Sequence, residues 1–331
     1  MQTGKTEHNM PYHQISRRTA LAGALLAAAS PSRLLAQSLE RIRVSIIPVY
    51  DVAPLYAAIV KGYFRDVGLD VDTAPTAGGA AGIPGLIGGS VDIAYGNVVS
   101  ALLAVKQGLD LKVIAAGTKN TGFATDKTQI MVAADSGIKS AKELEGKSLA
   151  VNTRNNVIWL YARAWIKKSG ANPDLVSFRE VPFPQMEDAV RQRRVDAAFM
   201  IPPFSITAAA KPGLLGIGQP YSEVQIGADI GQYLTTGKIL AQKPEAIRKF
   251  AEGLRKGVEW FNANKLGDEA LGIVSGYTKM DAGLLKSVGD MGTSPLRSDM
   301  AQIKQTMDLM IDSKLLNGPI DLSTVVAPIA L

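Results

Sequence analysis

The stretch Ser90-Val91-Asp92-Ile93-Ala94-Tyr95 is followed by a helix-forming run over residues 98–106 and then by Leu111-Lys112-Val113-Ile114-Ala115-Ala116. The two flanking segments predict strands, and so do residues 42–47 and 69–73 upstream, each separated from the next strand by helical spacing. Strands that alternate with helices at this spacing predict a parallel sheet covered on both faces.

The same pattern returns in the second half of the chain. Four further segments predict strands, namely 129–133, 148–151, 176–181 and 195–199, and a long amphipathic helix is expected over 157–169. Helices are also expected over 186–193 and 204–210, and a last strand over 213–217.

Two short internal echoes favour a duplicated architecture. Val91-Asp92-Ile93-Ala94-Tyr95 matches Val195-Asp196-Ala197-Ala198-Phe199, and Leu55-Tyr56-Ala57 matches Leu160-Tyr161-Ala162. Both echoes occur in the same order within their halves, so we expect two similar lobes.

From residue 232 the pattern changes. A strand over 233–236 is followed by segments that predict helices, at 244–262, 267–275, 282–288 and 298–313. Such a tail has too little apolar surface to stand alone, and we expect it to pack on the first lobe.

The N-terminus has the features of an export signal. Paired arginines in Ser16-Arg17-Arg18-Thr19-Ala20-Leu21 precede an apolar run over 20–29, and a small residue, Ala36, closes the segment. This arrangement resembles a twin-arginine signal, with an ordinary secretion signal as the alternative. We expect residues 1–36 to be removed and the mature protein to be periplasmic.

The residues that the mature chain lacks exclude several chemistries. His8 and His13 lie in the expected leader and the chain has no cysteine. Nucleophilic Ser-His or Cys-His pairs, zinc sites of the usual His/Cys kind, disulfides and a lipid anchor on cysteine are therefore excluded. Carboxylate catalysis and a hard-metal site stay open, although we expect no cofactor and no metal.

The charge pattern is weak for nucleic acid. The net charge of the full chain is +6, and the longest basic block is Arg191-Gln192-Arg193-Arg194. Nucleic-acid binding usually needs a broad basic face, so we expect no nucleic-acid partner.

Several blocks, taken together and in order over about residues 42–265, give the chain a family resemblance. They are Lys61-Gly62-Tyr63-Phe64, Gly68-Leu69-Asp70-Val71, residues 89–96, 144–151 and 186–198, and Pro244-Glu245-Ala246-Ile247. In these blocks the chain resembles periplasmic solute-binding proteins of ABC importers, in the nitrate/sulfonate/taurine and thiamine-precursor-like group.

The resemblance implies an α/β, two-lobed periplasmic binding protein fold of the type II kind, with two chain crossings and a helical C-terminal tail. The first lobe is expected over 38–120 with 232–331, and the second over 121–231. The ligand would lie between the lobes, and the partners would be a membrane permease and its ATPase. We expect a monomer.

Candidate ligand residues follow the strands of the first lobe. Tyr50 could stack on a ring or donate its hydroxyl, and Asp51 could pair with an amine or cap the next helix. Gly78 and Gly79 could let the backbone approach the ligand or simply form a turn. After Tyr95, Asn97 could bind the ligand or cap the following helix.

In the second lobe, Thr153, Arg154 and Asn155 lie between a strand and a long helix. Arg154 is the best candidate for holding a carboxylate or sulfonate with its bidentate fork, unless it is solvated and Asn155 or Asn156 is a helix cap. Phe204 could form an apolar wall or belong to the core. The group usually shows an acidic residue before this Pro-Phe pair, where the chain has Pro202.

The leading hypothesis is a binding protein that delivers a small organic anion, an aromatic or aliphatic sulfonate or carboxylate, to a permease. One alternative is a ligand sensor without a transporter. Another is an enzyme resembling thiamine-pyrimidine synthases, whose chemistry uses histidine and a cysteine-rich segment that the mature chain lacks.

Overall fold

The computed structural model describes residues 1, 38–76 and 78–331. The chain divides into two compact units, Met1–Ser38 and Leu39–Leu331, and all the described helices and strands belong to the second. Apart from Met1, the expected signal peptide lies outside the described residues. Within residues 38–76 and 78–331, no helix is both long and apolar enough to cross a membrane.

The first sheet has five strands in the order β2-β1-β3-β10-β4. In that order they are β2 (Leu69–Pro75), β1 (Glu40–Ile46), β3 (Ile93–Asn97), β10 (Asp229–Thr236) and β4 (Leu111–Lys119). β1 pairs in parallel with β2 and β3, whereas β10 is antiparallel to both of its neighbours.

The second sheet repeats this order as β7-β6-β8-β5-β9. Its strands are β7 (Ser177–Glu180), β6 (Ser148–Val151), β8 (Ala197–Met200), β5 (Gln129–Ala133) and β9 (Leu214–Gly218). Here β5 is the antiparallel strand. The two sheets with their helices form the two expected lobes, and the equal strand orders agree with the duplication that the echoes predicted.

The expectation of purely parallel sheets is wrong. β5 and β10 are the strands that enter each sheet directly after a chain crossing, and both run against their neighbours. A strand that arrives from the other lobe needs no parallel crossover helix, so its direction is set by where the crossing enters.

Helices follow the strands as expected, with short additions. In the first lobe they are α2 (Ala53–Val60), α3 (Tyr63–Asp66), α4 (Gly79–Ile87) and α5 (Val98–Lys106), and in the second α6 (Val157–Lys168), α7 (Phe183–Arg191) and α8 (Phe204–Ala209). α5 and α6 begin at asparagine caps: Asn97 Oδ1 accepts from Ser100 N at 2.9 Å and Asn156 Oδ1 from Trp159 N at 3.1 Å. The sequence did not predict α3 or the short helix α9 (Pro220–Val224).

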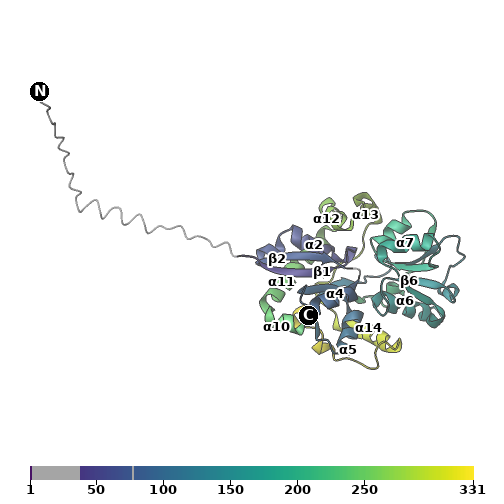
Figure 1. The fold of residues 1–331 in the computed structure, drawn as a ribbon. Coiled ribbons are helices and arrows are strands. Elements are labelled where there is room, and N and C mark those ends of the chain that lie inside the picture. The colour runs from purple at the N-terminus through teal and green to yellow at the C-terminus, as the bar shows by residue number, and fades with distance from the viewer. Residues whose placement is uncertain (2–37, 77) are drawn as a thin grey trace. The chain divides into compact units, whose positions relative to one another are not determined.

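The tail packs on the first lobe, as expected (Figure 1). Its helices are α10 (Gly237–Gln242), α11 (Pro244–Asn264), α12 (Asp268–Thr278), α13 (Ala282–Val288) and α14 (Met300–Asp312). Phe250 of α11 stacks on Phe64 with ring centroids 5.3 Å apart, and Val326 forms a bridge with Val113 of β4. α14 also reaches the second lobe, where the Tyr161 hydroxyl lies 3.0 Å from Thr306 Oγ1.

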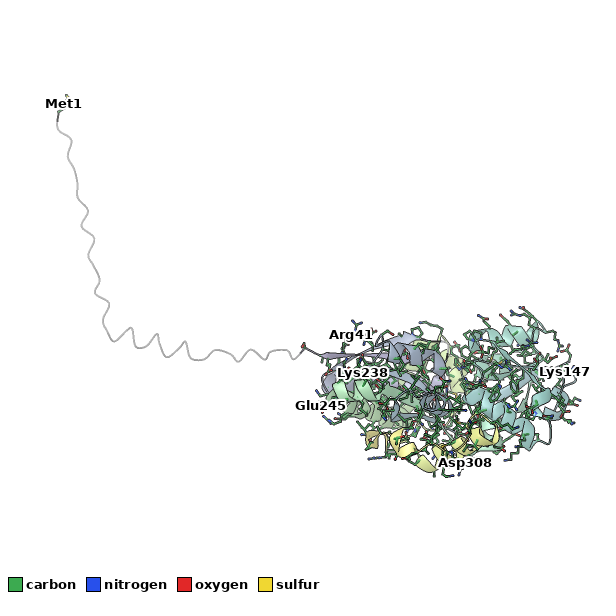
Figure 2. The ribbon with its side chains drawn as sticks, turned by 60° about the horizontal axis from the view of Figure 1, so that its bottom comes forward. Met1, Arg41, Lys147, Lys238, Glu245 and Asp308 are labelled. Atoms are coloured by element: carbon green, nitrogen blue, oxygen red, sulfur yellow. The ribbon has the colours of Figure 1, made fainter. Side chains whose placement is uncertain are left out.

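Charged side chains cover the outer surface of both lobes. Arg41, Lys238 and Glu245 on the first lobe, Lys147 on the second and Asp308 on α14 are all exposed (Figure 2). The core consists of the inward faces of the two sheets and their covering helices.

Two crossings join the lobes, over residues 120–128 between β4 and β5 and over 219–228 between β9 and β10. They are tied together by the backbone of Asn120, whose N–H donates to Ala228 O at 2.9 Å. Asp126 ties them through its side chain, since its Oδ2 accepts from Asn120 Nδ2 at 3.1 Å and from Ser222 Oγ at 2.7 Å. The crossings therefore form one hydrogen-bonded unit beside the space between the lobes.

Candidate functional site

Two adjoining cavities lie between the lobes, with volumes of about 60 and 40 Å³. The first, here the crossing cavity, is lined largely by the first crossing together with Tyr50, Lys119 and Met291. The second, here the amide cavity, is lined by Asn97 from the first lobe and by Asn152 and Asn156 from the second. Four residues border both cavities: Asp51, Ile201, Tyr221 and Ile230.

Asp51 lies at the junction of the two cavities. It belongs to a 3-10 turn, Tyr50–Val52, directly before α2, and its side chain caps neither that turn nor the helix. Its Oδ2 accepts a hydrogen bond from the Tyr95 hydroxyl at 3.3 Å. The helix-cap alternative for Asp51 is therefore not what the structure shows.

The carboxyl of Asp51 has a raised pKa. It borders the cavities, so its surface is partly accessible, but protein encloses it on the remaining sides. Burial raises its pKa to about 6, hydrogen bonds from Thr118 and Tyr95 oppose the rise, and the nearby charge of Asp126 adds to it. Desolvation penalises the charged form of a carboxyl, which accounts for the direction.

Three tyrosines surround this carboxyl. Tyr95 is buried and its hydroxyl lies 2.7 Å from Thr118 Oγ1. Tyr221, on the second crossing, is 4% exposed and borders both cavities, and its hydroxyl has no hydrogen-bond partner among the described residues. Tyr50 borders the crossing cavity and packs edge-on against Phe261 at 5.8 Å. Burial raises the pKa of all three phenols, which stay neutral.

The amide cavity lies at the starts of α5 and α6. Asn97 both caps α5 and borders the cavity, so the two alternatives for this residue coexist. Asn156 caps α6 and its Nδ2 donates to Asn152 Oδ1 at 2.8 Å. The first N–H groups of a helix have no partner within it, and they favour a negatively charged group.

Gly78 and Gly79 bring backbone close to the other walls of the amide cavity. A Cβ on Gly79 would lie 2.8 Å from Gly96 Cα and 2.9 Å from Asn97 Nδ2. One on Gly78 would lie 2.9 Å from Asn152 Nδ2, on the opposite lobe. Because glycine has no side chain, the backbone at both positions can lie this close to the neighbouring residues.

Some of the expected residues lie outside both cavities. Arg154 is exposed, and its backbone N–H donates to Glu180 Oε1 at 2.7 Å. Asn155 is exposed with a φ of 57°, and Thr153 lies beside Gly78. Phe204 stacks on Phe183, which borders the amide cavity, with centroids 5.8 Å apart. The structure thus brings together Tyr50, Asp51, Gly79, Tyr95 and Asn97.

The sequence reasoning missed several residues that border the cavities. Asn156 was predicted only as a possible helix cap, and no ligand contact was predicted for Asn152, Tyr221, Lys119 or Lys127. All five lie at a strand end, in the loop after β6 or on a crossing between the lobes, where polar residues without helical or strand periodicity are the available signal. In residues 38–76 and 78–331, no group of three or more His, Cys, Asp or Glu side chains could hold a metal ion.

Three solved structures with a similar fold are named as binding proteins. The chain is similar to the periplasmic aliphatic sulphonate-binding protein SsuA from Escherichia coli, with 16% identity, a TM-score of 0.69, and coverage of 86% of this chain and 96% of that one. For the alkanesulfonate-binding SsuA of Xanthomonas axonopodis pv. citri, bound to MOPS, the identity is 15%, the TM-score 0.73, and the coverage 87% and 98%. For the nitrate-binding NrtA of Synechocystis PCC 6803 the corresponding values are 16%, 0.72, 87% and 86%.

At these identities the structures establish the two-lobed periplasmic binding protein fold. None of the curated protein sequences compared with the chain matches it. A family model described as NMT1/THI5 like matches residues 50–265, which is more than half of the chain and includes both crossings and every described strand except β1. The chain therefore belongs to the NMT1/THI5-like family.

Proposed function

We propose that the protein is the extracytoplasmic solute-binding component of an ABC importer, which captures a small organic solute between its lobes and delivers it to a membrane permease and its ATPase. The observation that carries this proposal is the pair of cavities lined from both lobes, beside two hydrogen-bonded crossings. A ligand that binds the closed arrangement of the lobes more tightly than the open one shifts the equilibrium toward the closed form.

We propose a small organic anion, a sulfonate or a carboxylate, as the solute. The amide cavity supports this, because the starts of α5 and α6 border it with neutral amide donors from Asn97 and Asn152. Lys119 and Lys127 border the crossing cavity and supply positive charge there. We place the anionic group at these positions and not at Arg154, which is exposed and outside both cavities.

Export to the periplasm without a lipid anchor rests on the sequence. The twin arginines precede the apolar run of the leader, and the chain offers no cysteine for lipidation. A binding role is favoured over a synthase role because no histidine follows His13 and no cysteine is present. We propose that the protein acts as a monomer.

A thermal-shift screen of the purified protein tests the proposal. The panel contains sulfonates, aromatic and aliphatic carboxylates, amino sulfonates, nitrate and pyrimidines. A ligand at one hundred times its Kd stabilises the folded state by about 2.7 kcal/mol, which raises Tm by several degrees. Titration calorimetry then gives the Kd of each hit.

A pair of matched variants locates the binding site. Ile230 borders both cavities and is 7% exposed, whereas Ile226 is 57% exposed on the second crossing. Ile230→Trp should fill the cavities and abolish the shift, and Ile226→Trp should leave it intact. A ligand that binds both variants equally lies elsewhere, and a panel with no ligand counts against the proposed function.

A further inference from the structure

The carboxylate of Asp51 borders both cavities, and the fold gives it no cationic partner within the described residues. It takes part in no ion pair within the described part of the chain, and the groups that hydrogen-bond it are neutral hydroxyls, from Tyr95 at 3.3 Å and from Thr118. It borders both cavities, so a ligand in either one can reach it. An ionised carboxylate has about four lone-pair sites, so that of Asp51 can accept further hydrogen bonds from a ligand in either cavity.

Two other buried carboxylates, those of Asp92 and Asp126, are satisfied by protein groups. Asp92 accepts from Arg43 N at 2.9 Å and pairs with Arg43 Nε and Lys243 Nζ at 3.0 Å each. Asp126 accepts from Asn120, Ser222 and Thr128 across the crossings. Buried charges in proteins are normally paired or bonded in this manner. Asp51 departs from the pattern at the place where a ligand would bind.

Asp229 shows why the cavity matters. It too is buried with a raised pKa, and one of its oxygens has no hydrogen-bond partner among the described residues. However, Asp229 borders neither inter-lobe cavity, so no ligand there can complete its hydrogen bonds. Asp51 differs because the space beside its carboxylate is open to a solute.

The aromatic surroundings of Asp51 favour a positive partner. Tyr50, Tyr95 and Tyr221 all border the cavities that Asp51 joins, so a group bound to the carboxylate lies among ring faces and edges. Aromatic faces attract cations, and the attraction grows when water is excluded. Tyr221 borders both cavities, and its hydroxyl oxygen can serve as a further acceptor there. Carboxylate and tyrosines together suit a protonated nitrogen better than a second anion.

We propose that the solute carries a protonated amine, or another N–H cation, which binds the Asp51 carboxylate among Tyr50, Tyr95 and Tyr221. This inference rests on the proposed function and narrows the solute class. With the anionic group at the starts of α5 and α6, the solute is a zwitterion such as an amino sulfonate or amino acid. A solute of this kind neutralises Asp51 and satisfies the amide cavity at once.

Calorimetric titration with isosteric pairs tests the proposal. The pairs are taurine with isethionate, β-alanine with 3-hydroxypropionate, and 4-(aminomethyl)benzoate with 4-(hydroxymethyl)benzoate, which differ only in the ammonium or hydroxyl group. In the wild-type protein the amine of at least one pair should bind about 10–100-fold more tightly, the range for a hydrogen bond to a charged group. In Asp51→Asn this preference should disappear, while Asp70→Asn, at an exposed position on β2, should keep it.

The outcomes separate this inference from the proposed function. Equal binding within every pair, a preference for the hydroxyl member, or an amine preference that survives in Asp51→Asn overturns the inference. Tight binding of sulfonates or carboxylates that lack an N–H group, with no amine bound, overturns it and leaves the binding function intact. If Asp51→Asn does not fold, the affinity of the wild-type protein for each amine relative to its hydroxyl counterpart decides. Binding of no compound in the panel counts against both.

Discussion

Asp92 and Asp196 occupy equivalent positions in the two sheets. Each directly precedes the central strand of its sheet, β3 or β8, and each Oδ2 accepts from a backbone N–H of the neighbouring strand, β1 or β6: Arg43 N at 2.9 Å and Ser148 N at 2.8 Å. The registers agree as well, with Val44 beside Ile93 and Leu149 beside Ala197. The two sheets therefore share this local geometry, and a Val-Asp pair, Val91-Asp92 or Val195-Asp196, stands at the equivalent place in each.

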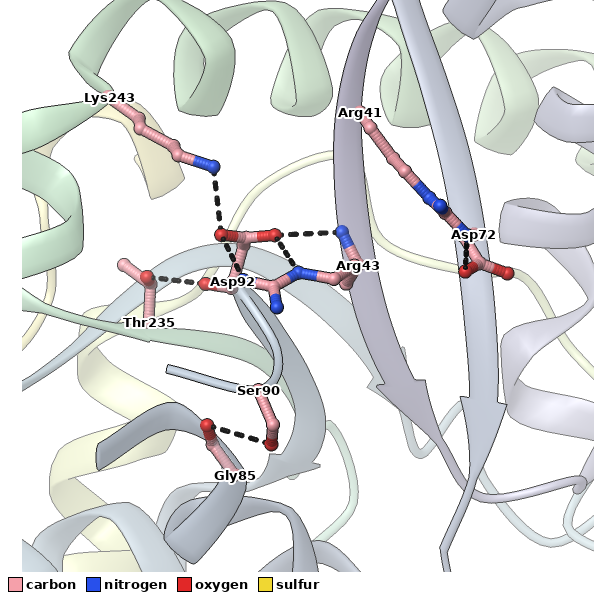
Figure 3. A network of polar contacts seen from close by, with 8 residues as sticks. All are labelled: Arg41, Arg43, Asp72, Gly85, Ser90, Asp92, Thr235 and Lys243. Carbon is pink, nitrogen blue, oxygen red and sulfur yellow. Dashed lines mark hydrogen bonds and ion pairs between the residues drawn. The ribbon is translucent and has the colours of Figure 1, made fainter. Parts of the chain in front are cut away.

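The two aspartates differ in what else they bind. Asp92 is 3% exposed and pairs with the side chains of Arg43 and Lys243, as Figure 3 shows. Among the described residues, Asp196 accepts from Ser148 alone, whose Oγ lies at 2.7 Å. Burial raises the pKa of Asp92, but the side chains of Arg43 and Lys243 outweigh this effect and hold the pKa below its usual range. Asp92 therefore links β1, β3 and the start of α11 in a way that Asp196 does not.

Asp92→Ala should lower the free energy of unfolding by about 2 kcal/mol, because it leaves two cations and one backbone N–H without their acceptor. The value is below the 3–5 kcal/mol of a fully buried pair because Arg43 and Lys243 can rehydrate. Asp72→Ala is the control: it breaks the exposed Arg41–Asp72 pair of Figure 3 and should change stability by less than about 1 kcal/mol. Urea unfolding measures both, and equal effects would contradict the assignment.

Asp229 should make the protein less stable as pH rises. Burial raises its pKa to about 7, its Oδ2 accepts from Asp299 N at 2.7 Å, and its Oδ1 has no partner in the part of the chain that the structure describes. A folded pKa above the unfolded value means that the folded state binds more protons, so stability present at low pH is lost as pH rises through 7.

Asp229→Asn resembles the protonated acid and should remove part of this dependence. Between pH 5 and 8 the wild-type free energy of unfolding should fall with a slope of up to about 1.4 kcal/mol per pH unit for one such group. The variant should show a flatter profile and exceed the wild type at pH 8. Urea unfolding at several pH values checks this, with Asp66→Asn at an exposed position as control. Parallel profiles for wild type and Asp229→Asn would contradict it.

The alternation of strands and helices could be read from the sequence because each element has its own periodicity. Residues 129–133, 148–151 and 282–288 were predicted with the bounds that the structure has. The direction of β10 could not be read from the sequence, because it depends on where the second crossing enters the sheet. That strand also begins at Asp229, before the expected lobe boundary at residue 232.

The site was predictable only in part, because the position of some of its residues depends on how a loop is anchored in the fold. Tyr50, Asp51 and Asn97 follow strand ends in the first lobe, where a parallel sheet directs its loops toward the cleft. In the loop after β6, the position of each residue depends on which asparagine caps α6. Because Asn156 is the cap, Asn152 faces the amide cavity and Arg154 faces solvent.

Tyr161 joins the second lobe, the second crossing and the tail. Its hydroxyl donates to Gln225 Oε1 at 2.8 Å and lies 3.0 Å from Thr306 Oγ1, in a fully buried setting. Tyr161→Phe should lower the free energy of unfolding by about 1–2 kcal/mol, because it leaves buried polar groups unsatisfied. Tyr63→Phe, whose hydroxyl has no partner among the residues described, should have little effect. Thermal or urea unfolding of both variants checks the difference, and similar losses would contradict it.

Binding of an amine to Asp51 should weaken at low pH. An ammonium needs the ionised carboxylate, and with a pKa of about 6 protonation of Asp51 competes with the ligand below that pH. The other titratable or charged groups that face the junction are Tyr50, Tyr95, Tyr221, Asp126, Lys119 and Lys127. Calorimetry from pH 5 to 8 should show affinity falling by up to about tenfold per pH unit below 6. An affinity that does not change over this range would argue against Asp51 as the partner.

Gly79 should be intolerant of any side chain. A methyl group there would lie 2.8 Å from the backbone Cα of Gly96 and 2.9 Å from Asn97 Nδ2, so β3 or the cap of α5 must move. Overpacking of this kind costs about 1–3 kcal/mol, and we expect Gly79→Ala to lose both stability and ligand affinity. Gly272→Ala, in α12 with nothing within 4 Å of the added Cβ, should instead stabilise the protein by up to about 1 kcal/mol. If Gly79→Ala binds ligand as tightly as Gly272→Ala does, the close approach of α4 to β3 does not shape the binding site.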